Sequence, residues 1–232
     1  MSKLHIVSTP IGNMGDITLR ALETLKEVEF VYAEDTRVTR KVLSRYDIHT
    51  PLRSYREMQP RPALERTIQE IITLLHEGKA LAYTSDAGTP GVSDPGDYLV
   101  RRVREAGFEV VTVPGASALA AIMSVSGLGC QHPLFEGFLP HKKGRQTRLK
   151  ELAGGLQQGI MDGVVFYESP ERILRLFAEL LEWNQPLSVC VGRELTKQFE
   201  EVVTGSLEEV QQEFAARPTI KGEIVLLVTT HA

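Results

Sequence analysis

The sequence predicts two α/β domains: an N-terminal one with a parallel sheet covered by helices on both faces, and a C-terminal one with a mixed sheet. Three observations support this fold class. Strand-like and helix-like segments alternate regularly through the first half of the chain. The alternation breaks once, around Cys130 to Arg145, and then resumes. Beyond the break, residues 193–205 leave little room for a crossover helix, which favours antiparallel pairing. We therefore expect domains at residues 1–130 and 131–232.

The first half carries the helix signals that bound such a sheet. One helix should begin near Asp16 or Thr18, which suit an N-cap, and another should end at Gly78, which suits the left-handed position after a helix. The expected strands cover residues 3–10, 30–35, 80–85 and 108–115, and the expected helices cover 16–28, 36–46, 63–78, 97–107 and 116–127.

The break at 130–145 contains two prolines, two glycines and a basic cluster, which are typical of a connection between domains. After it, Pro170 is expected in the first turn of a helix, where its missing N–H costs nothing. The remaining helices are expected at 146–156, 170–183 and 206–217, and the strands at 163–169, 186–195, 200–205 and 221–230.

Composition excludes several classes of protein. The chain of 232 residues is 42% hydrophobic and 24% charged, as in ordinary globular proteins, and its net charge of −4 does not favour nucleic-acid binding except through local basic patches. Cys130 and Cys190 are isolated, so we expect neither a disulfide framework nor a metal site. No segment is long and apolar enough for a membrane span, and the apolar stretch before Pro10 is too short for a signal peptide. We expect a cytoplasmic protein.

The loops that follow the predicted parallel strands are rich in glycine, proline and small residues. In an open parallel sheet, ligands bind outside the carboxyl ends of the strands. The loops in question are STPIGNMGD at 8–16, AEDTR at 33–37, SDAGTPGVSDPG at 85–96 and PGASA at 114–118. Their convergence on one edge predicts a ligand cleft, although tight turns also use these residues for purely structural reasons.

The same loops exclude the common phosphate sites. The chain contains no GxxxxGK[ST], no GxGxxG and no GxSxG motif. The loops are partly acidic and lack a dedicated Lys or Arg for phosphate, which favours a neutral or cationic ligand.

Several motifs, in order, resemble the ribosomal RNA branch of the tetrapyrrole methylase family. They are HIVSTPIGNMGDITLRALETL, YAEDTR, TSDAGTPGVSDPG, VPGASA, FEGFLPHK, FYESPERI, RELTKQFEE and KGEIVLLV. The resemblance covers residues 4–228 and implies two α/β domains with S-adenosylmethionine in the cleft between them. It further implies methylation of the 2′-oxygen of a cytidine ribose in small-subunit (16S) ribosomal RNA, free or in the 30S subunit, by a homodimer. Relatives often continue into a small helical tail, whose contacts should be missing or replaced here.

The resemblance also implies cofactor contacts, residue by residue. Thr89 stands where relatives often have Asp. The implied contacts are Pro10, Ile11, Gly88, Thr89, Pro90, Val92, Ser117 and Ala118, followed by Tyr167, Glu168, Gly222 and Glu223.

A ribose hydroxyl is a poor nucleophile, so a carboxylate base near it should help the reaction. The candidates are Glu34, Asp35 and Glu168, with Glu223 as a further one. At each of these positions an ion pair is the competing interpretation, with Arg37, Arg172 or Lys221 as the partner.

Two basic patches are candidates for phosphate contact, which fixes register rather than reading sequence. The first forms one stripe of the helix predicted at 36–46, and the second lies in the segment 141–150. Their members are Arg37, Arg40, Lys41 and Arg45 in the first patch, and Lys142, Lys143 and Arg145 in the second. A solvated surface is the competing interpretation of either patch.

Two other functions remain open at this stage. A methyltransferase of the same fold could act on a tetrapyrrole or another small molecule, and its basic residues would then bind carboxylates. Alternatively, the chain could be a non-catalytic RNA-binding protein of ribosome assembly that retains the fold.

Overall fold

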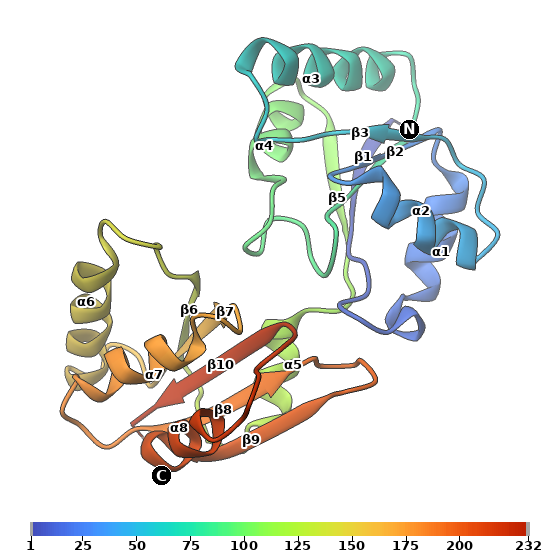
Figure 1. Cartoon of the computed structure of the whole chain (residues 1–232). Coiled ribbons are helices and arrows are strands. Elements are labelled where there is room, and N and C mark those ends of the chain that lie inside the picture. The colour runs from blue at the N-terminus through green and yellow to red at the C-terminus, as the bar shows by residue number, and fades with distance from the viewer. Residues whose placement is uncertain (1, 231–232) are drawn as a thin grey trace. The chain divides into compact units, whose positions relative to one another are not determined.

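The computed structural model describes residues 2–230 and divides the chain into two compact units, with the division between Ser117 and Ala118 (Figure 1). The sequence instead predicted the division after Cys130. The difference is helix α5 (Ala118–Val125), which packs on strands of the second unit through side chains such as Ile122.

The first unit is built on a five-stranded sheet in which every neighbouring pair is parallel. Its strand order is β3-β2-β4-β1-β5. The strands are β1 (Lys3–Val7), β2 (Phe30–Ala33), β3 (Leu52–Ser54), β4 (Leu81–Thr84) and β5 (Glu109–Val113). The parallel sheet predicted for this half is confirmed. The short edge strand β3 was not predicted.

Alternate residues of these strands point to two separate cores. Leu81 and Tyr83 pack with α3 (Arg61–His76) and α4 (Asp97–Glu105) on one face. Ala82, between them, packs with α1 (Leu19–Glu27) and α2 (Thr36–Arg45) on the other. Helices therefore cover both faces, as predicted, because the period-2 alternation of each buried strand supplies apolar side chains to both.

The helix ends follow the sequence signals. Thr18 caps α1, its side chain accepting the N–H of Ala21 at 3.1 Å. Gly78 follows α3 with φ +88°, and the Gly78 and Lys79 N–H groups donate to the carbonyls of Leu75 and Leu74. This is the Schellman arrangement, and it requires the left-handed residue that glycine provides.

The second unit has a mixed five-stranded sheet of order β6-β7-β10-β8-β9, in which only β6 and β7 are parallel. The strands are β6 (Pro133–Phe138), β7 (Gly163–Glu168), β8 (Ser188–Arg193), β9 (Glu201–Ser206) and β10 (Ile224–Thr229). The predicted antiparallel pairs are confirmed. Strand β6 lies within the segment that the sequence predicted to be a connection.

The two faces of this sheet are covered differently. The main core of the unit, which includes Phe166 and Leu226, is completed by α6 (Arg145–Gln157), α7 (Ile173–Leu181) and α8 (Leu207–Ala215). The opposite face packs against α5. Helix α7 begins three residues later than predicted, because Pro170 lies in a turn that precedes it.

Candidate functional site

The candidate site is the edge of the first sheet where β4, β1 and β5, which are neighbours in the order, end. The loops that leave these three strands are joined by backbone hydrogen bonds. Thr9 and Gly88 exchange N–H···O=C bonds of 2.8 and 3.1 Å, forming a short antiparallel bridge, and Ser8 N–H donates to the Val113 carbonyl at 3.0 Å. The structure thus brings together the loops at 8–11, 85–92 and 114–117, as the strand order requires. We call this set the rim.

A side-chain hydroxyl connects all three rim loops. The Thr89 hydroxyl donates to the Ala116 carbonyl at 3.2 Å and lies 3.0 Å from the Ser8 hydroxyl. Thr89, which the resemblance assigned to the cofactor, therefore has a structural role within the rim. A hydroxyl can make both contacts because it accepts as well as donates a hydrogen bond.

The rim glycines are required by loop packing. Gly88 has φ +75°, and a Cβ there would lie 3.2 Å from Ile11 Cγ2. A Cβ on Gly115 would lie only 3.0 Å from Ser8 Cβ. Part of the glycine content is thus explained by contact between the loops.

Four carboxylates lie in the loops that follow the neighbouring strands β3, β2 and β4, close enough to influence one another. They are Glu57 after β3, Glu34 after β2, and Asp86 and Asp94 after β4. Burial, with added repulsion from Asp86, Asp94 and Glu57, raises the pKa of Glu34. Burial raises the pKa of Asp94 to about 6, although a Ser85 hydrogen bond opposes the shift. The sequence indicated that the loops are acidic but did not single out Glu57, Asp86 or Asp94. Within residues 2–230, no group of three or more His, Cys, Asp or Glu side chains is placed to hold a metal ion.

The raised pKa of Asp94 predicts a pH-dependent gain in stability for Asp94→Asn. The folded protein holds the Asp94 proton up to about pH 6, against an ordinary value of 3.8, so stability falls as pH rises through this interval. The variant should be more stable at pH 8 by about 1 kcal/mol, a figure reduced because water screens a half-buried group, and unchanged at pH 4. Urea unfolding at both pH values measures the difference. An equal difference at pH 4 and pH 8 would contradict this assignment.

Asp35, a predicted catalytic candidate, has a structural role. Its carboxylate caps α2 by accepting the Arg37 N–H at 2.8 Å and pairs with the Arg37 guanidinium at 2.5 Å. Hydrogen bonds from Arg37 hold the pKa of Asp35 well below its ordinary range. A base of such low pKa accepts a proton poorly, which disfavours Asp35 in catalysis.

Glu168 is likewise held in an ion-pair network. Its side chain is fully buried and pairs with Arg172 at 2.6 Å and with Arg145 at 3.5 Å. Glu179 completes the network, 2.7 Å from Arg145. Of the three candidate bases, Glu34 alone forms no ion pair among residues 2–230.

The other cofactor contacts predicted in the second unit lie together at one sheet edge. Ile224 pairs with Glu168, so Gly222 and Glu223 precede β10 where Tyr167 and Glu168 end β7. Glu223 is exposed, its carboxylate 3.1 Å from Lys197. The predicted contact Ala118 begins α5 in this unit, and the Tyr167 hydroxyl accepts the N–H of Leu119 at 3.2 Å.

The other predicted contacts belong to the first unit, where Pro10, Gly88 and Pro90 are buried and Ile11, Thr89, Val92 and Ser117 are half-buried.

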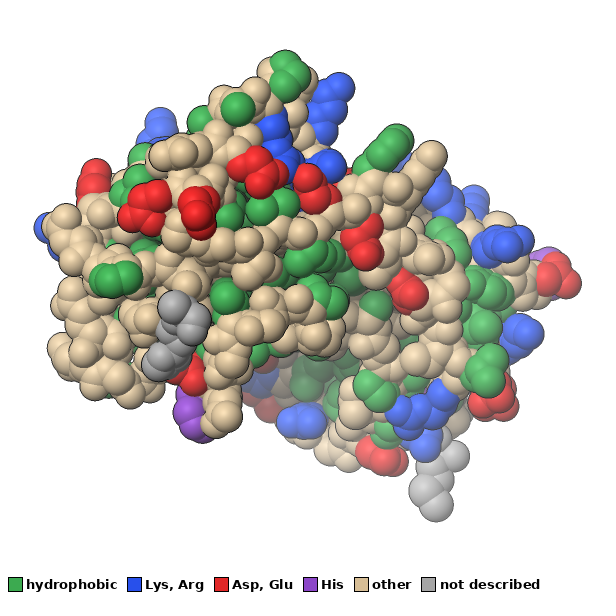
Figure 2. Space-filling model, turned by 90° about the horizontal axis from the view of Figure 1, so that it is seen from below, with side chains coloured by type: hydrophobic (Ala, Val, Ile, Leu, Met, Phe, Trp, Pro, Cys, Tyr) green, Lys and Arg blue, Asp and Glu red, His purple; other side chains and the backbone are tan. Residues whose placement is uncertain are grey.

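The predicted RNA contacts divide into exposed and buried residues. The stripe on α2 is exposed at all four positions, although Arg37 is engaged by Asp35. Lys142 and Lys143 are also exposed. Figure 2 shows acidic and basic side chains interspersed on the face it presents, without one continuous basic surface.

The prediction of Arg145 as an RNA contact is wrong. Its side chain is only 1% exposed and its guanidinium is occupied by Glu179 and Glu168. The residue begins helix α6 and faces the protein interior, whereas the lysines just before it face solvent.

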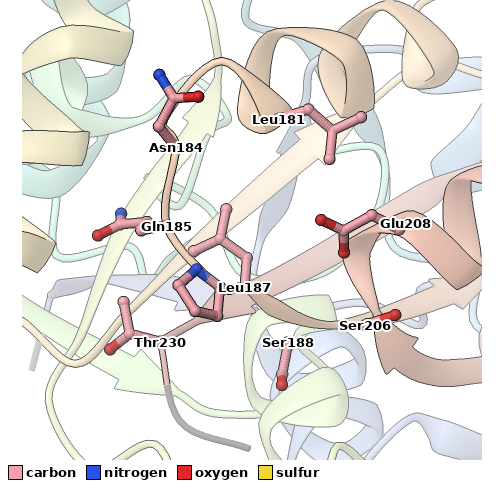
Figure 3. A pocket seen from close by; sticks show the side chains of 9 residues that line it. Leu181, Asn184, Gln185, Leu187, Ser188, Ser206, Glu208 and Thr230 are labelled. Atoms are coloured by element: carbon pink, nitrogen blue, oxygen red, sulfur yellow. The ribbon is translucent and has the colours of Figure 1, made fainter.

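A pocket of about 540 Å³ lies elsewhere in the second unit, at the other end of its sheet (Figure 3). Thr230, Ser188 and Leu187 line it, and Thr229 pairs with Gly163, at the end of β7 opposite Glu168. None of the predicted site residues lines this pocket.

Comparison with known proteins identifies the family. The model of the family described as Tetrapyrrole (Corrin/Porphyrin) Methylases matches residues 3–211. The chain belongs to the tetrapyrrole methylase family. This is a family of S-adenosylmethionine-dependent methyltransferases, so the predicted class of enzyme and its cofactor are confirmed.

Curated tetrapyrrole methylase relatives are similar over nearly the whole chain. Ribosomal RNA small subunit methyltransferase I of Thermotoga maritima is 43% identical over 229 residues, which cover 99% of each chain. The protein of the same name from Leptospira biflexa is 44% identical over 227 residues, covering 97% of this chain and 90% of the relative.

Solved structures of other methyltransferases share the fold. A cobalt precorrin-4 methyltransferase matches with a TM-score of 0.69 at 17% identity, covering 97% of this chain and 94% of the other. The uroporphyrin III C-methyltransferase of Thermus thermophilus matches with a TM-score of 0.64 at 18% identity, covering 98% and 97%. The predicted fold class, a parallel sheet followed by a mixed sheet, is confirmed. In the described part of the chain, no helix has the length and apolar character needed to cross a membrane.

Proposed function

We propose that this tetrapyrrole methylase transfers a methyl group from S-adenosylmethionine to the 2′-oxygen of a cytidine ribose in small-subunit ribosomal RNA. The observation that carries the proposal is the identity of 43% over 229 residues with a ribosomal RNA small subunit methyltransferase I. The protein acts in the cytoplasm, where this RNA is found, and as a homodimer, as the resemblance implies.

The rim of the first unit fits the cofactor. Gly115 is exposed and carries no side chain, so a nucleoside can approach the backbone closely there. The carboxylates of Glu34, Asp86 and Asp94 suit the positive charge of a sulfonium, and no Lys or Arg lies in the loop from 85 to 96. When bound, S-adenosylmethionine supplies an activated methyl group. The contacts implied at Tyr167, Glu168, Gly222 and Glu223 remain predictions from the resemblance.

The chain's own contribution to the chemistry is to orient the ribose and to accept its proton. We assign the proton acceptor to Glu34. It has no ion-pair partner among residues 2–230, and burial raises its pKa towards the range useful for a general base. Asp35 and Glu168 are engaged by arginines instead. The exposed basic residues Arg40, Lys41, Arg45, Lys142 and Lys143 contact phosphates.

Methyl transfer can be tested directly with radiolabelled S-adenosylmethionine. Purified protein is incubated with 30S subunits, or with free 16S ribosomal RNA, from cells that lack this enzyme. The proposal expects label in 2′-O-methylcytidine after nuclease digestion and mass spectrometry. A parallel incubation with a precorrin controls for substrate class. Label found only in the tetrapyrrole, or no transfer to any substrate, would overturn the proposal.

A further inference from the structure

Phe138 is a large aromatic side chain that the fold leaves exposed. It is the last residue of β6, which lies at the end of the sheet beside β7 (Figure 1). The residue is 55% exposed. Exposure alone does not mark a binding site, because single exposed apolar residues are common, so the surroundings of the ring carry the argument.

A β-bulge directs this side chain to the face it occupies. Phe135 pairs with Val165, Gly137 with Phe166 and Phe138 with Tyr167, so Glu136 is the extra residue. In a regular strand Phe138, three residues after Phe135, would point to the opposite face, towards the main core of the unit. The bulge, with Gly137 at φ +67°, turns Phe138 to the Phe135 face instead. Bulges of this kind re-aim side chains near functional sites.

Tyr167 fixes the ring of Phe138 in place. Both Phe135 and Phe138 meet Tyr167 edge-to-face, with centroid distances of 5.1 and 5.7 Å. The contact with Tyr167 holds the Phe138 ring in one orientation, and Phe138 remains more than half exposed to solvent. A fixed, half-exposed ring is a platform on which a planar base can stack at little entropic cost.

The segment after Phe138 is basic and anchored at both ends. Leu139 and Arg145 are buried, and Arg145 donates to the Pro140 carbonyl at 3.4 Å. Between these anchors, Lys142 and Lys143 are exposed and form no ion pair among residues 2–230. The anchors therefore hold two free positive charges a few residues from the aromatic ring.

We propose that Phe138, Lys142 and Lys143 form a binding site for a single-stranded segment of the substrate RNA. One nucleobase stacks on the Phe138 ring, and the flanking phosphates contact the two lysines. Aromatic stacking together with positive charge along the backbone is how proteins bind unpaired RNA. This inference rests on the proposed function and adds to it the form of RNA that the second unit recognises.

The test compares matched variants in binding a fluorescein-labelled, single-stranded RNA of 12 mixed nucleotides. Phe138→Ala should weaken binding about tenfold, because one base loses its stacking partner. Phe138→Trp should retain affinity. The matched control is Phe199→Ala, which removes a 65% exposed phenylalanine from the connection between β8 and β9 and should change nothing. The double variant Lys142→Ala/Lys143→Ala should lower the slope of log affinity against log salt by about 1.4.

Calorimetry with S-adenosylmethionine and sedimentation velocity accompany each binding assay. Unchanged RNA affinity in Phe138→Ala overturns the inference. So does a loss of cofactor affinity alone, which would make Phe138 a cofactor contact, or dissociation into smaller species, which would make it part of a contact between copies. If the unmodified protein methylates 16S ribosomal RNA while Phe138→Ala binds normally, only this inference fails. If the unmodified protein transfers no methyl group to that RNA, the proposed function fails.

Discussion

Replacement of Glu34 by Gln should lower kcat for methyl transfer about 100-fold or more, with the affinity for S-adenosylmethionine changed little. Glutamine has nearly the same shape, so the backbone around position 34 is preserved, but its amide cannot accept the ribose proton. Glu34 is suited to that step because burial and the charges of Asp86, Asp94 and Glu57 raise its pKa. Single-turnover assays with 16S ribosomal RNA measure the rate, and calorimetry measures the affinity.

The pH dependence distinguishes a base from a structural carboxylate. In the unmodified protein, kcat should fall as pH falls through the raised pKa of Glu34, because the protonated carboxyl no longer accepts a proton. This acidic decline should be absent in Glu34→Gln. Glu23→Gln, an exposed position on α1, is the matched control and should behave like the unmodified protein. A Glu34→Gln variant with full activity would exclude Glu34 as the base.

Arg145→Ala should lower the free energy of unfolding by about 3–5 kcal/mol, since it leaves buried carboxylates without their partner. Arg145 is 1% exposed and pairs with Glu179 at 2.7 Å and with Glu168 at 3.5 Å. Urea unfolding followed by circular dichroism measures the loss. Lys143→Ala, two residues away and exposed, should change stability by less than about 0.5 kcal/mol.

A double variant tests whether Arg145 acts as a buried ion-pair partner or as a surface contact for RNA. In Arg145→Met/Glu179→Met, two apolar side chains of similar length replace the ion pair, and most of the stability lost in Arg145→Ala should return. If Arg145→Ala instead cost less than about 1 kcal/mol and weakened RNA binding, Arg145 would be a surface contact after all.

Local signals in the sequence predict most of the fold. Thr18 and Gly78 mark the ends of their helices because a cap depends on neighbouring residues alone. Strand β3 was missed because its three residues, Leu52–Ser54, include an arginine and lie at the sheet edge, where apolar alternation is weak. Strand β6 was missed because Pro133 and Gly137 resemble loop residues, although one begins the strand and the other forms a bulge.

The site was predictable where topology decides it and not where distant partners do. Parallel strands deliver their following loops to one edge, so the rim could be predicted from the alternation of elements. Arg145, in contrast, reads as one more residue of a basic run, because its partner Glu179 lies 34 residues further along the chain. The difference between Glu34 and Asp35 is likewise set by side-chain direction, which two adjacent acidic letters do not reveal.

The most direct test of the account is a crystal structure of the protein grown with S-adenosylmethionine. We expect the nucleoside against the rim, in contact with the loops at 8–11, 85–92 and 114–117, where Gly115 is exposed and carries no side chain. An ordered cofactor bound away from these loops, for example in the pocket beside Leu187 and Thr230, would contradict the account.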